Sequence, residues 1–576
     1  MSLAKLANVR PEPPKITVRR SARRRWSAAE TARRLGPGQS LERLKLSRLT
    51  IEGDLDLRGV ALRGELELAD VVLRGRLRLD EARLAAGLSL RGVLLEGGLC
   101  LDHARVDGDL RIASLRLGED LRGRGLIVSG ELLTQGITAP AAAEDRPISL
   151  DLRDAEVQGG VELHGIRLPG DLLLDDAALG GWTDLSGLEA RRLGLRRLRL
   201  DSGFELHHAH LRQDLEAGEL QAAEDVSLRD SRIGAELDLR RGIIGGRLDV
   251  MRLDAKALRL DGARLSGGAL AAELTCGELT APAAEVEAAI ELRAARIAGD
   301  VHLDQLLCEN LDLAGARIAG SLGLSGAELG ELRLEDTVIG GDLGLEGASL
   351  TGVSADRVSC RGDARLVGTD ILGSLDARDA IFDRRLCLRP RSLFGPLRLS
   401  GTRAAHPDLD ASGLCDAVEP TAVVELEEAA ATVSVLAGWL ESQNDYAAMD
   451  AMRLRGHALR RRRRSGVLGG MLSLLEWLLV ALPTGYGLRP GRVAASLIAL
   501  GLSVGVLAHR HPAAFGQAEL GLRDAVGIGL GAMSGRPLGL APLPDSPFAF
   551  GLPLAGLIGV LLTALLVGSL TRVLAR

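Results

Sequence analysis

The chain has 576 residues, of which 72 are glycine and only 12 are aromatic (six Phe, four Trp and two Tyr). Its core must therefore consist almost wholly of aliphatic side chains, which excludes the usual mixed cores of several globular domains and favours internal repeats. The formal charge of −6 is unevenly distributed, because residues 1–40 carry ten Lys and Arg against two acids, residues 453–576 carry fourteen Arg against four acids, and residues 41–452 hold the balance of −24.

The N-terminal segment, residues 1–40, lacks the apolar run of a secretory signal, so we expect the soluble part of the protein to stay in the cytoplasm. Residues 1–25 are expected to form a basic, disordered tail. Within residues 26–40, Ser27 and Glu30 have the spacing of a capping box, which predicts a short helix ending near Leu35 that covers one end of the following domain.

An eleven-residue period then begins, marked by Gly53, Gly64, Gly75, Ala86, Gly97 and Gly108. Leucine or isoleucine stands two and four places after each of these markers, and mainly polar residues separate the apolar ones. This alternation predicts β-strands. Beyond residue 286 some steps shorten to ten, so the complete repeat is a pair of half-coils of about 21 residues.

These observations predict that residues 41–405 form an all-β solenoid in which four short faces close each coil. Glycine at a corner is expected to permit backbone angles that a side chain would oppose. Asp54 and Arg76, and likewise Asp56 and Arg78, are expected to lie one above the other on an outer face. Each exposed pair contributes only about 0–1 kcal/mol, so the inward columns of Leu, Ile and Val must provide most of the stability.

Residues 406–465 are predicted to form a helical cap and a basic linker. An amphipathic pattern over residues 421–441 predicts one helix, and a second helix starts at Asp445; caps are expected because unpaired strand edges promote aggregation. The second helix runs into five consecutive arginines, which we expect to bind the membrane surface. This predicted basic cluster comprises Arg460, Arg461, Arg462, Arg463 and Arg464.

Residues 466–576 contain three apolar stretches and are predicted to be a membrane region. Residues 549–571 exceed the roughly 20 residues that cross a bilayer, and residues 493–508 are long enough if flanking arginines extend to the surface. Residues 467–482 contain Glu476, so we interpret them as an interfacial helix. Arginine is concentrated outside the loop between the two spans, which predicts a multi-pass protein of the inner (cytoplasmic) membrane with the solenoid and both termini in the cytoplasm.

Two sequence patterns resemble a known family. Rungs such as residues 316–324 (ARIAGSLGL) resemble those of bacterial pentapeptide-repeat-type membrane proteins, a resemblance that implies a right-handed quadrilateral β-helix. Residues 484–492 (TGYGLRPGR) resemble the GYG-x-x-P-x-R element that precedes the first span in such proteins, and this implies a membrane elbow at Tyr486, Pro490 and Arg492. Some relatives carry a two-span ion-channel module, and others are labelled membrane-associated oxidoreductases, a name for which this sequence offers no physical reason.

The glycine motifs near the spans do not match known binding sites. The TGYG sequence at residues 484–487 lacks the preceding span of a potassium filter, and the region between the spans lacks T-x-G-Y-G. The glycine series from Gly527 to Gly535 lacks the surroundings of a dinucleotide site, so a re-entrant turn or close helix packing is the better interpretation. Gly501 and Gly505 indicate a helix contact inside a span.

No catalytic residue, cofactor site or metal site is predicted. His207, His208 and His210 form the only histidine cluster, but the solenoid frame places them on an outer face and corner, and whether they bind anything stays open. The six cysteines have neither disulfide-framework nor zinc-finger spacing and are interpreted as reduced, small hydrophobic residues.

The resulting hypothesis is a non-catalytic protein-interaction scaffold anchored to membrane lipid, with an unknown cytoplasmic protein as partner. The alternative is an oligomeric two-span ion channel, or a degenerate channel module, with the solenoid as its regulatory domain. A homo-oligomer therefore remains open. Nucleic acid is not an expected partner, because the solenoid's negative charge is too dilute to imitate a duplex.

Overall fold

The computed structural model describes residues 24–27, 40–139, 147–410, 414, 426–462, 471, 473, 474, 476–481, 485–536, 538 and 540–574. Its contacts define two compact units, one of Met1–Arg333 with Thr337–Gly341 and the other of Leu334–Asp336 with Asp342–Arg576. The fold is a parallel β-solenoid of about 16 turns, followed by a helical region with two apolar helices, as the sequence predicts.

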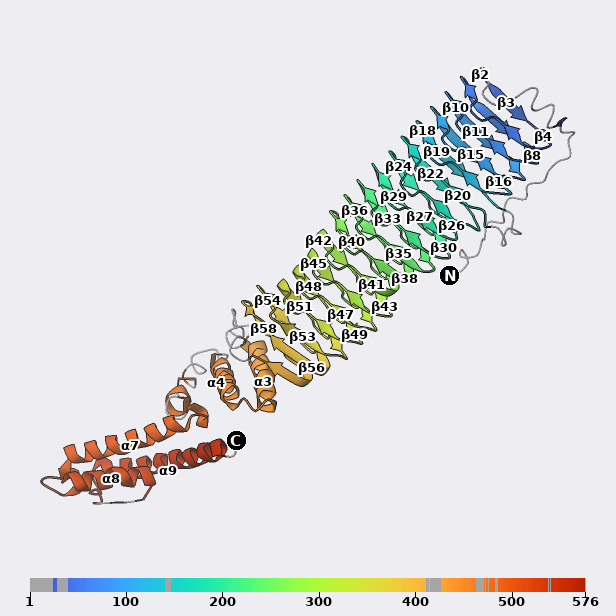
Figure 1. Ribbon diagram of the computed structural model, residues 1–576. Helices are drawn as coiled ribbons and strands as arrows, with labels where there is room; N and C mark the ends of the chain where they lie inside the picture. The colour runs from blue at the N-terminus through green and yellow to red at the C-terminus, as the bar shows by residue number, and fades with distance from the viewer. Residues whose placement is uncertain are drawn as a thin grey trace, which may run out of the picture. The chain divides into compact units, whose positions relative to one another are not determined.

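From β2 (Ser40–Leu41) onward, each coil at the start of the solenoid contains four short strands, and each strand pairs in parallel with the fourth strand after it (Figure 1). This four-strand repeat confirms the prediction of four faces. The pairs of one representative coil are β4 (Leu49–Ile51) with β8 (Val72–Leu73), β5 (Leu55–Asp56) with β9 (Leu77–Arg78), β6 (Ala61–Leu62) with β10 (Arg83–Leu84), and β7 (Leu66–Ala69) with β11 (Gly87–Arg91).

Strand register reproduces the sequence period. Leu55, Leu77, Leu99 and Leu121 are successive partners, so each lies two eleven-residue half-coils beyond the one before it. Leu121 then pairs with Leu150, and the longer step accommodates the insertion that follows Thr138. Where a half-coil in the later part of the solenoid loses one residue, two faces merge into one longer strand, as in β42 (Glu285–Glu291), β45 (Leu307–Asp312) and β48 (Glu328–Arg333).

The core of the solenoid is almost wholly aliphatic, with Phe204 and Phe382 among its few buried aromatic side chains. The leucines that the eleven-residue period marks as inward, such as Leu55, Leu57, Leu66 and Leu68, are fully buried. Their stacking along the coils removes each apolar face from water, at about 25 cal/mol per Å² of buried apolar surface. One coil alone cannot achieve this burial, so the pattern has to continue through many coils.

Most marker glycines do not lie at the corners of the coil. Apart from Gly53, they do not adopt left-handed angles; those angles occur further along each half-coil, at Gly59, Glu81 and His103. A Cβ on Gly108 would clash with the Ala86 carbonyl oxygen. Glycine does occupy several of these corners, such as Gly59, Gly315 and Gly326, as expected, whereas the marker glycines are needed where the backbones of successive coils approach closely.

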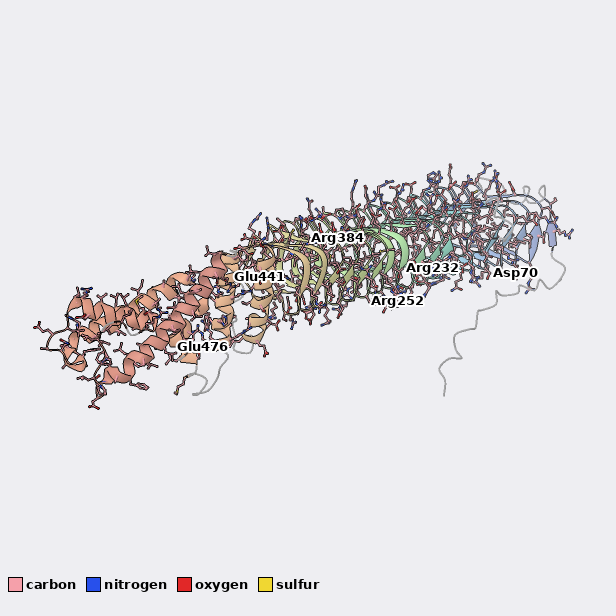
Figure 2. The ribbon with its side chains drawn as sticks, turned by 90° about the horizontal axis from the view of Figure 1, so that it is seen from below. Asp70, Arg232, Arg252, Arg384, Glu441 and Glu476 are labelled. Carbon is pink, nitrogen blue, oxygen red and sulfur yellow. The ribbon has the colours of Figure 1, made fainter. Side chains whose placement is uncertain are left out.

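Charged side chains project from the outside of the solenoid, among them Asp70, Arg232 and Arg252 in Figure 2. Asp56 and Arg78 are strand partners, as predicted, but the Asp56 carboxylate binds Arg58 at 2.8 Å. The Arg76 guanidinium binds Glu119 at 2.6 Å, while the Asp54 carboxylate accepts the Arg76 backbone N–H. The charged residues therefore stack along the coils as predicted, but each side chain forms its ion pair with a neighbour other than the predicted one.

The two ends of the solenoid differ in what the structure describes. Strand β1 (Arg24–Trp26) pairs with β4, whereas residues 28–39, which hold most of the predicted cap helix, lie outside the described residues. At the other end, after β59 (Arg403–Leu409), the helix α3 (Leu426–Ser442) covers the last coil. Thr432 Oγ1 accepts the buried Leu399 N–H at 3.0 Å, so the helix satisfies a backbone group that an uncovered edge would leave without a partner.

Helix α4 (Tyr446–Arg462) packs against α3, and the remaining helices form a separate bundle. Figure 1 shows α7, α8 and α9 side by side. The elements after α4 are the π-helix η4 (Trp477–Ala481), the short 3-10 helix η5 (Gly485–Gly487), α7 (Pro490–Arg510), the 3-10 helix η6 (Pro512–Phe515), α8 (Leu522–Ser534) and α9 (Pro547–Leu574).

Candidate functional site

The histidine cluster of the solenoid does not form a metal site. His207 Nε2 lies 2.7 Å from Ser227 Oγ, His208 occupies a left-handed corner, and His210 lies in β30 (His210–Leu211) beside Glu189 and Arg232. Among the described residues, no group of three or more His, Cys, Asp or Glu side chains is arranged to hold a metal ion. The three histidines therefore have separate structural environments.

The described cysteines are poor nucleophiles. Burial raises the pKa of Cys276 and of Cys308 to about 12, and the pKa of Cys360 to about 11. A thiol with such a pKa carries almost no thiolate at neutral pH, which is the form that reacts. These positions act as small hydrophobic residues, while Cys415 lies outside the described residues.

The helical region is the most distinctive part of the chain. Two described helices, Pro490–Arg510 and Pro547–Arg572, are long and apolar enough to cross a membrane. Large apolar side chains on both helices are exposed, including Leu502 and Val506 on α7 and Leu557 and Leu561 on α9. In water this exposure is unfavourable, whereas in hydrocarbon the same side chains are well solvated.

Glycine brings the three helices of this bundle into close contact. A Cβ on Gly529 of α8 would clash with the Gly501 carbonyl oxygen of α7, and a Cβ on Gly505 would lie 3.0 Å from the Ala525 carbonyl oxygen. Gly559 of α9 leaves no room for a side chain beside the Ala532 carbonyl oxygen of α8. The interpretation of Gly501 and Gly505 as a helix contact is confirmed, and α8 is held between both long helices.

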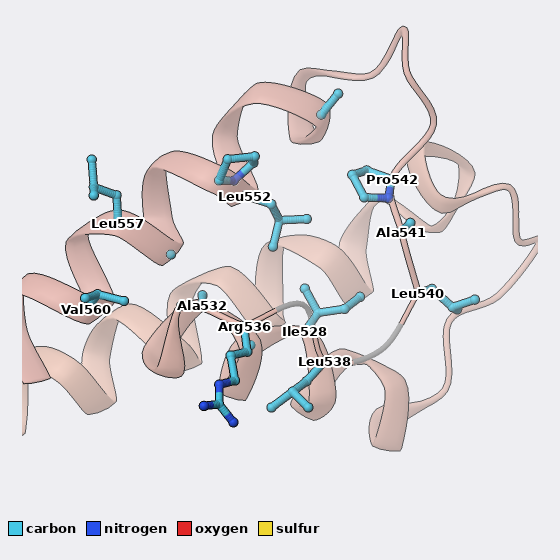
Figure 3. Close-up of a pocket in the computed structure, with 15 residues that line it drawn as sticks. Ile528, Ala532, Arg536, Leu538, Leu540, Ala541, Pro542, Leu552, Leu557 and Val560 are labelled. Carbon is cyan, nitrogen blue, oxygen red and sulfur yellow. The ribbon is translucent and has the colours of Figure 1, made fainter.

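Helix α8 also separates two apolar pockets. One of about 590 Å³ lies between α8, α9 and the loop that joins them, where Ile528, Leu538, Leu552 and Val560 surround it (Figure 3). Arg536 is the one charged residue among those that line it. The other, of about 290 Å³, lies between α7 and α8. Apolar residues make up most of both linings, and His509 and Arg510 are among the residues that line the second pocket.

The predicted membrane elbow forms a small aromatic and polar cluster. The Tyr486 ring stacks on His457 of α4, with 4.1 Å between ring centroids, and the Arg461 guanidinium lies 5.8 Å from the same ring. The Tyr486 hydroxyl donates to Glu476 at 2.9 Å. Pro490 opens α7, where its missing N–H costs nothing, and Arg492 is exposed in the first turn.

The predicted basic cluster precedes this elbow in the chain, and Arg461 connects the two. Arg460, Arg461 and Arg462 lie in the last turn of α4, where cations interact favourably with the helix dipole. Arg463 and Arg464 lie outside the described residues. At the C-terminal end of α9, the Arg572 guanidinium forms an ion pair with Asp450 of α4 at 3.4 Å. The end of α9 is thus on the same side of the bundle as α4.

The close helix packing that the sequence offered as one interpretation of the Gly527–Gly535 series is confirmed, but neither the bounds of α8 nor the contact between Tyr486 and His457 was predicted. The glycine series in residues 527–535 obscured a helix whose small residues recur every three or four positions, and that spacing was the available signal. No protein-family model matches the chain, and neither a curated protein nor a solved structure matches it either.

Proposed function

We propose that the protein is a membrane-anchored, non-catalytic scaffold whose solenoid binds a partner protein. The observation that carries this proposal is the contrast between the buried aliphatic core of the solenoid and the outward apolar side chains of α7 and α9. The solenoid offers a long, regular, charged surface, and its described residues contain no metal-ligand cluster. A surface of this kind suits protein binding better than catalysis.

The proposed topology places the solenoid and the C-terminus on the cytoplasmic side. The contact between Arg572 and Asp450 supports a hairpin in which α7 and α9 cross the membrane in opposite directions. Arginine is abundant on α4 and at both outer ends of this hairpin, whereas the end of α7 and the segment that follows it have Arg510, Arg523 and Arg536. The distribution follows the positive-inside rule for an inner membrane protein.

Membrane anchoring is tested with the full chain carrying a reporter after Arg576. We expect the chain to remain in the membrane pellet after alkaline carbonate extraction, and the reporter to be active only in a form that works in the cytoplasm. A chain recovered in the supernatant would contradict the anchor, and a periplasmic reporter signal would contradict the topology.

Scaffolding is tested by binding, with the full chain in lipid nanodiscs. A partner captured by crosslinking in cells should, once purified, bind the nanodiscs saturably and with a fixed stoichiometry. Reversal of charge at Arg232 and Arg252, which project from the solenoid, should change that affinity, because exposed charges set the rate and specificity of association. Binding that does not saturate would contradict the scaffold.

A second candidate function is an ion channel, and α8 is the observation that favours it. With 13 residues, α8 is about 20 Å long and too short to cross a hydrocarbon core of about 30 Å. A short helix and a loop between two spans resemble the arrangement that lines a pore when several copies assemble. Ion flux through liposomes that contain the purified protein tests this alternative; a monomer without flux would contradict it.

A further inference from the structure

A polar pocket of about 250 Å³ lies between α3 and α4, outside the apolar bundle. Its α3 wall includes Ser434 and Gly438, and its α4 wall includes Arg453, His457 and Arg460. Gly438 leaves the pocket open, because a Cβ placed there would meet no atom within 4 Å. The pocket is smaller than those of about 300–1,000 Å³ that hold drug-sized ligands, so it suits a compact group.

The pocket has an excess of positive charge. Arg453, His457 and Arg460 recur at helical spacing and therefore share one face of α4. Arg453 binds Glu441 at 2.8 Å, whereas Arg460 has no ion-pair partner within the described part of the chain. The residues that line the pocket thus include two arginines, one histidine and one serine, and no carboxylate is among them.

We propose that this pocket binds one phosphate group. Guanidinium groups bind phosphate through charge-assisted hydrogen bonds, and Arg460 with His457 provides donors on one side of the pocket while Ser434 provides a hydroxyl on the other. The phosphate comes from the headgroup of an anionic phospholipid or from a free phosphate compound. Only the lipid source rests on the proposed membrane anchor, because α4 leads into the elbow that precedes α7.

Binding should be stronger at lower pH. The pKa of His457 is lowered by burial and by the charges of Arg460 and Arg461, while Glu476 opposes this effect. Tyr486 stacks on the imidazole, Arg453 shares its face of α4, and Glu441 of α3 pairs with Arg453. A bound phosphate adds negative charge beside His457 and favours its protonated form, so affinity rises as pH falls through the histidine range.

The test uses the full chain in nanodiscs made of zwitterionic lipid, with inorganic pyrophosphate titrated by calorimetry, and a parallel series of nanodiscs that contain phosphatidic acid. Arg460→Gln removes a donor, and Gly438→Leu fills the pocket without changing charge. Each should weaken binding about tenfold or more. The matched control for the pyrophosphate series, Arg462→Gln, removes a charge from the same helix end but does not line the pocket, and should change pyrophosphate affinity in zwitterionic nanodiscs less than about twofold.

If pyrophosphate binds in zwitterionic nanodiscs and Gly438→Leu abolishes this binding, the result supports the site with a free phosphate compound as its ligand. Hydrogen exchange in α3 and α4 reports whether the pocket is occupied. If phosphatidic acid alone reduces this exchange, and Gly438→Leu removes the reduction, the result supports the lipid source. Equal losses in Arg460→Gln and Arg462→Gln with no effect of Gly438→Leu would indicate diffuse attraction and overturn the proposal, as would no binding in either series. Failure of the anchor itself would appear separately, in carbonate extraction.

Discussion

The solenoid and the helical bundle use similar residues in opposite ways. In the solenoid, leucine columns face inward and charged side chains face outward. In the bundle, small residues face inward, where Gly501, Gly529 and Gly559 allow close helix contact, and leucines face outward. Water drives apolar side chains together, whereas lipid does not, so packing of small residues must hold the bundle. The proposed membrane anchor thus places one chain in two solvents.

The largest expected effect comes from placing charge on the outward face of α9. Leu557 and Leu561 are 59% and 56% exposed, so in water a double substitution with arginine would be harmless. At the centre of a spanning helix each arginine costs about 2.5–3.5 kcal/mol. We therefore expect the double variant to disappear from the membrane fraction, as measured by immunoblotting.

Leu307→Arg is the matched control, because Leu307 lies on the solenoid and is 50% exposed. Its stability should change by less than about 0.5 kcal/mol. If the α9 variant remains in the membrane as well as this control does, the two regions do not face different solvents.

Removal of one side chain from a leucine column should give the next largest effect. Leu77 lies between Leu55 and Leu99 in the stack and is fully buried. Leu77→Ala should destabilise the solenoid by about 2–5 kcal/mol, because it creates a cavity. The measurement is the urea midpoint followed by circular dichroism, with Leu372→Ala at an exposed position as the silent control. Similar midpoints for the two variants would argue against a continuous core.

A methyl group at the α8–α9 contact should have a smaller effect. Gly559→Ala forces a Cβ against the Ala532 carbonyl oxygen, whereas a Cβ on Gly568 of the same helix meets nothing within 4 Å. We expect Gly559→Ala to cost about 1–3 kcal/mol by overpacking. Gly568→Ala should be neutral or slightly stabilising, since alanine is the better helix former. Thermal unfolding in detergent compares the two, and equal Tm values would be inconsistent with the described packing.

The smallest expected effect concerns an ion pair of the solenoid. Burial opposes the charge on Asp171, but hydrogen bonds and charges from Arg191 and Arg192 outweigh it and lower the pKa of Asp171 below its usual value. The Asp171 contribution is therefore complete above the unfolded pKa of about 3.9 and is lost as the pH falls through the lower folded value.

Since the arginines are partly exposed, Asp171→Asn should cost only about 1 kcal/mol at pH 7. The difference from the unsubstituted chain, measured by urea unfolding, should shrink below about pH 4. A difference that persists unchanged at pH 2 would mean that the aspartate acts through shape rather than charge.

Local periodicity made the solenoid predictable. Each half-coil repeats the same alternation, so inward residues such as Leu55 and Leu66 can be identified from spacing alone. The function of the marker glycines was not predictable in the same way, because a close approach between Gly108 and Ala86 depends on how two coils stack. The ion pair between Arg76 and Glu119 was not predictable either, because it forms only where the arginine side chain is long enough to reach an acid two coils away.

The helical region was predictable only where hydropathy decides the structure. Long apolar stretches identify α7 and α9, because a spanning segment requires about 20 such residues. The position of α8 depends on contacts between glycines that are distant in sequence. The stacking of His457 on Tyr486 joins α4 to the elbow before α7, and no local pattern encodes a contact between such separate segments.

The most direct test of the two-solvent account is a spin-label measurement of accessibility in membranes. Nitroxides are attached to Leu557→Cys on α9 and, separately, to Leu307→Cys on the solenoid, after Cys100 and Cys415 have been replaced by serine. The account predicts that the label at 557 collides with oxygen but not with a water-soluble nickel chelate, and that the label at 307 collides with the chelate. Equal access of the chelate to both positions would contradict it.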